Sequence, residues 1–347
     1  MNGFILFALI ILTLVIGRSI FLPLLVATFL WYLTNAIAAY YRKILPYGKK
    51  YCVMNKTLCK AFDLTSFLLS LATLVGLFYA FVTQIRPMMT QLVASLPEIQ
   101  SKLMTLLNYI AGQFGVTVSP AALPNITGIA ANIGMGMAGA LMSFGMVLVY
   151  MLFMFIEQST FNKKIARLFP DSKRFKKINF ILDSINDNMK KYMFMKTAMS
   201  AATALVSYFW LKYLGVEFAG VWAFIIFIMN YIPTFGSIVA TTLPVVYVLL
   251  TAATLTTPLL VAAGLIAVQI VFGNIIEPRL TGKTLNLSTL AILINLMFWG
   301  MIWGAVGMFF SVPLLVATFI ICSQFDKTRW IAVLLSADGE IPEKEED

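Results

Sequence analysis

Runs of apolar residues, interrupted by short polar stretches, make up most of this chain. Several runs approach or reach the roughly 20 apolar residues that a helix needs to cross the hydrocarbon core of a bilayer. The runs are residues 4–16, 20–41, 64–85, 129–156, 197–214, 219–250, 259–276, 285–298 and 301–322. This pattern predicts an all-α, polytopic integral membrane protein of about eight membrane segments, with broken or re-entrant helices in its C-terminal half. The length of residues 285–298 leaves open whether this segment spans the membrane or re-enters it.

Two other stretches alternate apolar and polar residues at helical spacing. In residues 88–128 this spacing predicts an amphipathic arm outside the membrane. The apolar face of the arm packs on the protein's own spans or lies at the lipid surface, or else it contacts another protomer. Residues 158–196 predict a basic cytoplasmic linker with a second amphipathic helix. Its apolar face carries Ile178, Leu182, Ile185, Met189 and Met193.

Composition agrees with a membrane protein and suggests an orientation. Hydrophobic residues make up 60% of the 347 residues and charged residues 12%, against about 25% charged in soluble proteins. The net charge is +10, and 16 of the 25 lysines and arginines lie in residues 42–60 and 163–196. Loops rich in Lys and Arg stay cytoplasmic, so we predict cytoplasmic basic loops that face anionic headgroups, and two cytoplasmic termini. No aromatic platform accompanies the charge, so nucleic acid is not an expected partner.

These patterns divide the chain into six parts. They are spans 1–3 with a basic cytoplasmic loop at 42–63 (1–87), the external arm (88–128), the fourth span (129–157), the basic linker (158–196), the C-terminal transport half (197–325) and a polar cytoplasmic tail (326–347). The tail is rich in acidic residues and is expected to be disordered.

The apolar run 219–250 is too long for one unbroken span and contains a polar interruption. The interruption reads Asn230-Tyr231-Ile232-Pro233-Thr234-Phe235-Gly236-Ser237. Because Pro233 removes a backbone donor and Gly236 relaxes the chain, we predict a broken or sharply bent helix. Non-helical backbone at membrane depth persists only where protein or a water-filled cavity satisfies it, and transporter sites are often built there. A purely structural kink is the alternative.

A second interruption, residues 269–282, carries the charges of Glu277 and Arg279. A charge near the bilayer centre costs roughly 2.5–3.5 kcal/mol on insertion scales, so it is expected to be paired, hydrated or functional. Pro278 lacks an N–H and biases the residue before it away from helical geometry. We therefore predict that this stretch is the working centre of a membrane transporter. A structural ion pair at a helix end is the alternative.

Several kinds of chemistry have no residues to support them. The chain has no histidine, and its three cysteines have no metal-motif spacing. No Gly-rich phosphate loop followed by Lys-Ser or Lys-Thr occurs, and there is no serine elbow or paired carboxylate. We predict no catalytic residue, no metal, no cofactor and no enzymatic activity.

The C-terminal motifs resemble the signature of the AI-2E (autoinducer-2 exporter) transporter family. They are the stretch from Asn230 to Ser237, the stretch Asn274-Ile275-Ile276-Glu277-Pro278-Arg279-Leu280-Thr281-Gly282, and Trp303-Gly304-Ala305-Val306-Gly307-Met308 with Val312-Pro313. The resemblance covers nearly the whole chain in layout and is specific between about Tyr208 and Pro313. It implies a bacterial inner-membrane protein, oligomeric in some members, that exports a small signalling molecule or exchanges sodium for protons.

Three functions follow as hypotheses. The first is a transporter or facilitator of a small polar solute through a polar path at the two interruptions. The second is a sodium/proton antiporter in which Glu277 binds either cation. The third is a membrane scaffold that transports nothing. The predicted path residues are Asn230, Pro233, Thr234, Phe235, Gly236, Ser237, Gln269, Asn274, Glu277, Pro278, Arg279 and Gly282.

Overall fold

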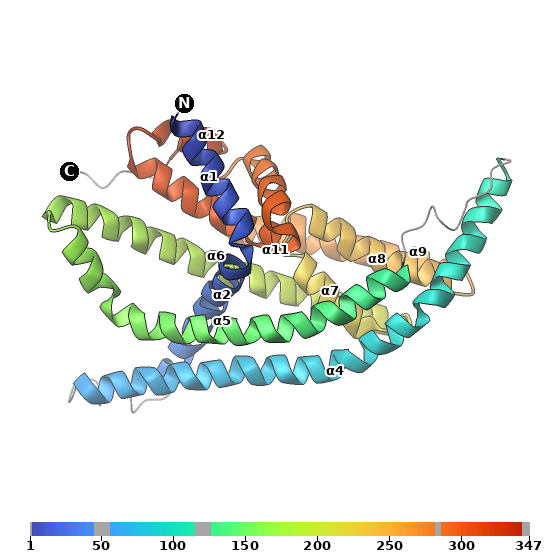
Figure 1. The fold of residues 1–347 in the computed structure, drawn as a ribbon. Helices are drawn as coiled ribbons and strands as arrows, with labels where there is room; N and C mark the ends of the chain where they lie inside the picture. The colour runs from blue at the N-terminus through green and yellow to red at the C-terminus, as the bar shows by residue number, and fades with distance from the viewer. Residues whose placement is uncertain (1, 45–55, 115–125, 282–285, 342–347) are drawn as a thin grey trace. The chain divides into compact units, whose positions relative to one another are not determined.

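The computed structural model describes residues 2–44, 56–114, 126–281 and 286–341, and most of these residues are helical (Figure 1). The elements in chain order are α1 (Asn2–Ile16), α2 (Arg18–Ile44), α4 (Lys56–Gly112), α5 (Ile126–Leu168), α6 (Ser172–Tyr213), α7 (Ala219–Met229), α8 (Phe235–Thr251), α9 (Thr256–Gln269), the π-helix η2 (Ile270–Ile276), α10 (Glu277–Thr281), α11 (Thr289–Gln324) and α12 (Arg329–Leu335). Within the described ranges, extended residues pair only in an isolated bridge between Leu287 and Ser336. The predicted all-α class is confirmed.

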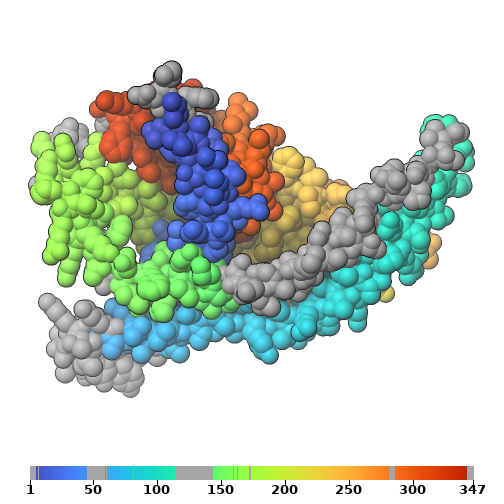
Figure 2. All heavy atoms as spheres, viewed as in Figure 1, coloured from blue at the N-terminus to red at the C-terminus, as the bar shows by residue number. Residues whose placement is uncertain are grey.

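Four stretches of described helix are long and apolar enough to cross a membrane. They are Arg18–Ile44, Ala61–Gly112, Thr256–Leu280 and Thr289–Gln324. Phe144–Gln158, α7 and α8 are shorter apolar helices. Figure 2 shows α1 at the molecular surface, where Leu6 and Ile16 expose 60% and 71% of their area. Such exposure of large apolar side chains fits a surface that faces lipid.

The chain forms two compact units. The first unit contains Met1–Gly76, Phe144–Thr197 and Arg279–Asp347, and the second contains Leu77–Ser143 and Ala198–Pro278. The helices α4, α5, α6 and α10 each contribute residues to both units.

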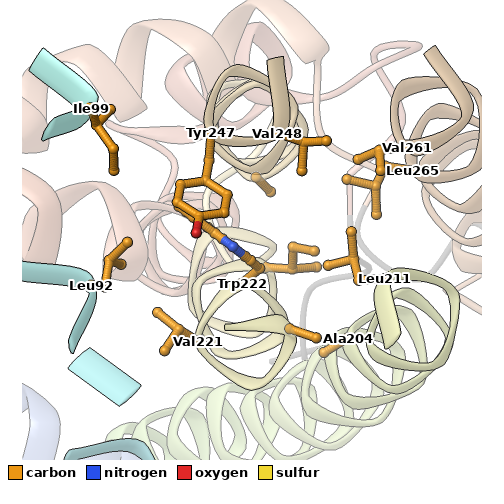
Figure 3. Close-up of a cluster of buried hydrophobic side chains, with 13 residues drawn as sticks. Leu92, Ile99, Ala204, Leu211, Val221, Trp222, Tyr247, Val248, Val261 and Leu265 are labelled. Atoms are coloured by element: carbon orange, nitrogen blue, oxygen red, sulfur yellow. The ribbon is translucent and has the colours of Figure 1, made fainter. Parts of the chain in front are cut away.

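The core of the second unit is built around Trp222 of α7 and Tyr247 of α8, whose rings lie 5.3 Å apart (Figure 3). Residues of α4, α6 and α9 surround this pair: Leu92, Ile99, Ala204, Leu211, Val261 and Leu265. Leu92 and Ile99 belong to the predicted external arm, so at these two positions the arm packs on its own protein. Farther along the arm, Tyr109 and Phe114 are 70% and 80% exposed.

The core of the first unit joins the basic linker to α11. Ile181, Met189 and Met193 of α6 pack with Val312, Val316 and Ile320 of α11. Of the predicted apolar face of the linker, Met189 and Met193 are buried and Ile178, Leu182 and Ile185 are half-buried. Its polar face is exposed at Asp183 and Lys190.

Three predicted boundaries are not helix ends. Helix α4 begins at Lys56, inside the predicted loop 42–63, and continues through Pro87 and Pro97 to Gly112. Helix α5 continues past residue 157 to Leu168, and α6 passes from the linker into the fifth span without a break. A proline removes only one helical hydrogen bond, and the apolar stripe that buries Leu92 and Ile99 continues beyond Pro87.

The prediction of a disordered tail is wrong for residues 326–341. Helix α12 packs through Ala332, with Leu335 and Ile341 beside it, on Phe319 and Cys322 of α11. The segment after α12 bonds to the residues before α11. Asn286 donates its Nδ2 to Asp338 Oδ1 at 2.6 Å, and Ala337 donates its N–H to the Asn286 carbonyl at 3.0 Å. The apolar residues among the charges of this segment provide the buried contacts that hold it. Residues 342–347 lie outside the described residues.

Candidate functional site

Helices α7 and α8 form an antiparallel hairpin. The ring of Tyr247, near the end of α8, lies 5.9 Å from the ring of Phe218, just before α7. Its hydroxyl donates a hydrogen bond of 2.9 Å to Oε2 of Glu217. Residues at the two outer ends of the hairpin are therefore in contact, and the chain reverses direction at residues 230–234. The predicted break is present, and it returns the chain toward the side from which it entered.

The length of α7 sets how far the tip of this hairpin lies from its base. Eleven residues make a helix of about 16 Å. Since the hydrocarbon core is about 30 Å thick, a helix of that length that starts at one surface ends near the midplane. The tip is where non-helical backbone is found, as expected for a transporter site.

The backbone of the tip is held by short-range hydrogen bonds. Asn230 donates its N–H to the Ile226 carbonyl at 3.0 Å, and Phe235 donates to the Pro233 carbonyl at 2.6 Å. Thr234 has a φ of +62°, which a β-branched residue rarely adopts. Strain of this kind costs roughly 1–3 kcal/mol and persists where the surrounding structure holds it, often at functional sites.

Gly236 makes the close return of the chain possible. A Cβ at this position would lie 1.7 Å from the backbone oxygen of Met229, which no real side chain could tolerate. The glycine is buried, and its N–H bonds to the Ile232 carbonyl at 3.0 Å. The sequence predicted that Gly236 loosens the chain. In the structure its role is narrower: the absence of a side chain lets the backbone at Gly236 contact the backbone at Met229.

The side chains of the tip have different environments. Asn230 is 8% exposed and donates its Nδ2 to Ser200 Oγ of α6 at 3.4 Å. Ser237, half-buried, donates its hydroxyl to the Thr234 carbonyl at 2.8 Å. Pro233 is half-buried, while Thr234 and Phe235 are exposed. The structure thus brings the first group of predicted path residues together in one turn.

The second group of predicted path residues lies on α9, η2 and α10. This segment is interrupted by a π-helix, and the N–H of Glu277 bonds to the carbonyl of Phe272, five residues earlier. Gln269 and Glu277 are half-buried, whereas Asn274 is exposed. A π-helical turn widens the backbone and is frequent at functional sites.

The last three predicted path residues give a mixed picture. Pro278 and Arg279 are exposed, and Gly282 lies outside the described residues. Glu277 and Arg279 are two positions apart in α10, a spacing that points side chains to different faces of a helix. Glu277 does take part in an interaction, so a structural ion pair at this helix end stays an alternative. That Gln269, Asn274 and Glu277 share one path with the tip of the α7–α8 hairpin stays a prediction. The side chain of Asn230 bonds to α6 and not to this segment.

A polar face of α6 was missed by the sequence analysis. Ser200, Thr203 and Ser207 are 0%, 0% and 1% exposed, although they stand in an apolar segment. Their spacing of three and four residues places them on one face of a helix, and this pattern could have been recognised in the sequence. Lys196, one turn earlier, was assigned to the basic linker as a surface charge, but it is 9% exposed and takes part in an interaction.

A second helical hairpin lies within α11, in the first unit. Gly304 has φ +64° and ψ −145°, which interrupts the helix, and Asn295 on one side donates its Nδ2 to the Ser311 carbonyl on the other at 2.6 Å. A Cβ on Gly307 would lie 2.0 Å from the Trp299 carbonyl, so the two limbs are in backbone contact. The first limb, Thr289 to Trp303, measures about 22 Å, which is short for a span. A re-entrant limb, one of the two possibilities for residues 285–298, is the one that this geometry favours.

The tip of the α11 hairpin is tied to α1. Trp303 donates its Nε1–H to the Leu14 carbonyl at 3.0 Å, and its ring lies 4.5 Å from that of Trp299. Leu14 is in the last turn of α1, where carbonyls have no helical partner. Trp303, a residue of the third C-terminal motif, therefore caps another helix.

The polar groups of the α7–α8 hairpin suit binding by hydrogen bonds. Amide, hydroxyl and backbone oxygen groups can exchange bonds with a polar solute. Across the described part of the chain, no group of three or more His, Cys, Asp or Glu residues could hold a metal ion.

Helical hairpins that place polar backbone inside an otherwise apolar, multi-pass protein define a membrane transporter of the α-helical class. The chain matches the sequence model of the AI-2E family transporters over residues 4–326. It belongs to this family, as its C-terminal motifs indicated.

Relatives of this chain carry transport names. The AI-2 transport protein TqsA of Escherichia coli K12 is 35% identical over 257 residues, which are 72% of this chain and 74% of TqsA. A putative transport protein of Haemophilus influenzae is 34% identical over 214 residues, 61% of this chain and 58% of that protein. The putative transport protein YhhT of E. coli K12 is 38% identical over 123 residues, 35% of each chain.

Proposed function

We propose that this protein exports a small polar solute across a bacterial inner membrane, with AI-2-type signalling molecules as the first solutes to test. The observation that carries the proposal is the α7–α8 hairpin, whose strained polar tip lies about 16 Å from its base. The name of TqsA supports the choice of solute.

The predicted path residues receive the following roles in this proposal. Asn230, Ser237 and the carbonyls near Pro233 exchange hydrogen bonds with the solute. Gln269, Asn274 and Glu277 continue the path along α9 and η2. Gly236 keeps the turn closed.

Flux through purified protein tests this function. Proteoliposomes loaded with labelled AI-2 or a neutral polyol should release it faster than protein-free liposomes. The Gly236→Ala variant should reduce release to near the protein-free rate, because its Cβ collides with the backbone at Met229. If liposomes with wild-type protein release every tested solute and cation no faster than protein-free liposomes, the scaffold hypothesis is favoured.

A second candidate, sodium/proton antiport, is favoured by the π-helix that ends at Glu277. In this mechanism the Glu277 carboxylate alternates between a proton and sodium. Glu277→Gln should abolish sodium-driven pH changes in proteoliposomes that contain a pH-sensitive dye. Glu98→Gln, which breaks an exposed ion pair with Lys102 on the arm, is the matched control and should leave them unchanged. Intact pH changes in the Glu277→Gln protein would exclude antiport through this residue.

The remaining partners are also proposals. We propose that both termini are cytoplasmic, that the exposed Lys163, Arg167 and Lys173 meet anionic headgroups, and that the protein is a homo-oligomer. Cysteine labelling at position 2 in intact cells should be blocked if the N-terminus is cytoplasmic. Native mass spectrometry with and without anionic lipid measures both the subunit number and bound lipid.

A further inference from the structure

Helix α12 has apolar residues on both of its sides. One side packs on α11 through Ala332, which is fully buried. The opposite side carries Trp330, Val333 and Leu334, which are 62%, 42% and 68% exposed. Their spacing of three and four residues places them on one face of the helix. A helix that is apolar all round is normally buried all round, so this outer face of α12 calls for an apolar environment.

Helix α12 is attached to the base of the α11 hairpin. Residues 325–328 join it to the end of the second limb. Its other end bonds to the residues before the first limb, because Ser288 donates its N–H to the Leu335 carbonyl at 2.8 Å and Ala337 donates to the Asn286 carbonyl at 3.0 Å. Helix α11 is long and apolar enough to enter a membrane. Since both limbs begin or end beside α12, this helix lies at the membrane surface from which the hairpin enters.

Basic side chains gather at the same base. Lys177 of α6 holds its Nζ 5.1 Å from the centre of the Phe325 ring, just before α12. The first turns of α6 also carry the exposed Lys173 and Lys176. Lys327 is exposed and Arg329, at the start of α12, is half-buried. Segments rich in Lys and Arg stay on the cytoplasmic side, so this is the side we assign to α12.

The acidic side chains that flank α12 in the sequence are engaged elsewhere. Asp338 accepts hydrogen bonds from Asn286 Nδ2 at 2.6 Å and from the Glu340 N–H at 3.0 Å. Asp326 also takes part in an interaction. The surface beside the outer face of α12 therefore complements a negatively charged partner.

The size of the outer face favours lipid over a second copy of the chain. A helix of seven residues is about 10 Å long. A specific protein interface buries about 800 Å² on each partner and takes roughly 20–30 residues a side, which three side chains do not supply. Apolar side chains bordered by cations are typical of helices that lie in the membrane interface, and tryptophan is enriched at that depth.

We propose that α12 is an interfacial helix that binds anionic phospholipid on the cytoplasmic side. Trp330, Val333 and Leu334 enter the boundary between headgroups and acyl chains, and Lys327 and Arg329 bind the phosphate groups. Bound lipid braces the base of the α11 hairpin, because α12 packs on α11 and bonds to the residues before it. This role goes beyond the proposed transport and does not depend on which solute is carried.

Tryptophan fluorescence measures where the outer face lies. Wild type and Trp330→Phe are reconstituted in vesicles of phosphatidylcholine and phosphatidylglycerol, with bromines placed near the headgroup end or near the methyl end of the acyl chains. The emission that Trp330→Phe lacks should be quenched most by the bromines near the headgroup. Trp222→Phe is the control, because Trp222 is 6% exposed and the emission it contributes should be quenched little.

Two outcomes of this measurement would overturn the proposal. Quenching of the Trp330 emission by aqueous iodide and not by bromolipid would show that the face lies in water. Quenching by neither reagent would show that a second copy or another protein covers it.

Titration with short-chain phosphatidylglycerol in neutral detergent tests the cations. The unfolding temperature of wild type should rise with this lipid and not with phosphatidylcholine or inorganic phosphate, because a ligand stabilises only a protein that binds it. Arg329→Gln should raise the half-effect concentration about fivefold, which corresponds to about 1 kcal/mol for one basic group near an anionic surface. Arg329→Lys keeps the charge and should recover most of this loss.

Equal half-effect concentrations for wild type and Arg329→Gln, or equal stabilisation by the two lipids, would contradict headgroup binding at α12. Stabilisation by inorganic phosphate alone would show an anion site that does not need lipid, and would also overturn the proposal. Both measurements use the full chain and neither measures flux, so their failure leaves the proposed transport function standing.

Discussion

The hydroxyl of Tyr247 and the carboxylate of Glu217 are joined by a hydrogen bond of 2.9 Å across the base of the α7–α8 hairpin. Thirty positions separate these residues in the sequence. Their contact shows that the chain reverses between them, and the rings of Phe218 and Trp222 close around Tyr247. The base is fastened at this bond, while the tip carries the polar groups.

Removing the Tyr247 hydroxyl should loosen the base and leave its packing intact. We expect Tyr247→Phe to lower the free energy of unfolding by about 1 kcal/mol, since the ring stays beside Trp222 and one hydrogen bond is lost. Tyr213→Phe is the control, because Tyr213 is 81% exposed. Thermal unfolding and amide exchange across residues 219–251 measure the effect. Equal stability of the two variants would mean that the bond contributes nothing.

Gly236 and Gly76 should respond in opposite ways to the same substitution. Gly236→Ala forces a Cβ to 1.7 Å from the Met229 oxygen and should cost about 2 kcal/mol or more, together with transport. At Gly76, inside α4, a Cβ meets no atom within 4 Å. Gly76→Ala should leave stability unchanged or raise it by up to about 1 kcal/mol. Unfolding temperatures of the two purified proteins decide the point, and a stable, active Gly236→Ala protein would contradict the close backbone contact.

The fold class and the positions of the interruptions could be predicted from the sequence. Both depend on local features: the length of an apolar run, and the proline, glycine and polar residues within it. The reversal of the chain was not readable in the same way. It depends on contacts such as Tyr247 with Glu217, between residues far apart in the sequence. The break at Gly304 lies inside the apolar run 301–322 and was not predicted, since a glycine in sequence does not reveal a φ of +64°.

Missed site residues have a different cause. Ser200, Thr203 and Ser207 are small and common in membrane helices, where they usually bond to their own backbone. Their significance comes from the hairpin that covers them, and that contact is tertiary. The tail was misread because its charges dominate its composition, although Ala332 and Leu335 find a buried surface on α11.

The Trp303 indole should stabilise the end of α1 through one bond. Trp303→Phe keeps an aromatic ring near Trp299 and removes the donor to the Leu14 carbonyl. A carbonyl left without a partner in this setting should cost about 1–3 kcal/mol. Trp330→Phe, at a position 62% exposed on α12, provides the comparison. Amide exchange in residues 2–16 should rise in Trp303→Phe alone, and unchanged exchange would show that the cap is dispensable.

Asn295 should be the most sensitive polar position of the α11 hairpin. Its Nδ2 donates to the Ser311 carbonyl at 2.6 Å, and its Oδ1 accepts from the Trp299 indole at 3.1 Å. Asn295→Leu removes both bonds, so we expect a loss of about 2 kcal/mol. Asn295→Asp keeps an acceptor for Trp299 but sets a carboxylate against the Ser311 carbonyl, and it should be at least as destabilising. Asn35→Leu is the matched control, because Asn35 bonds to the Trp31 carbonyl of its own helix and joins no second limb. Thermal unfolding of the three variants tests the order, and a loss in Asn35→Leu as large as that in Asn295→Leu would mean that the bridge between the limbs adds nothing to a local bond.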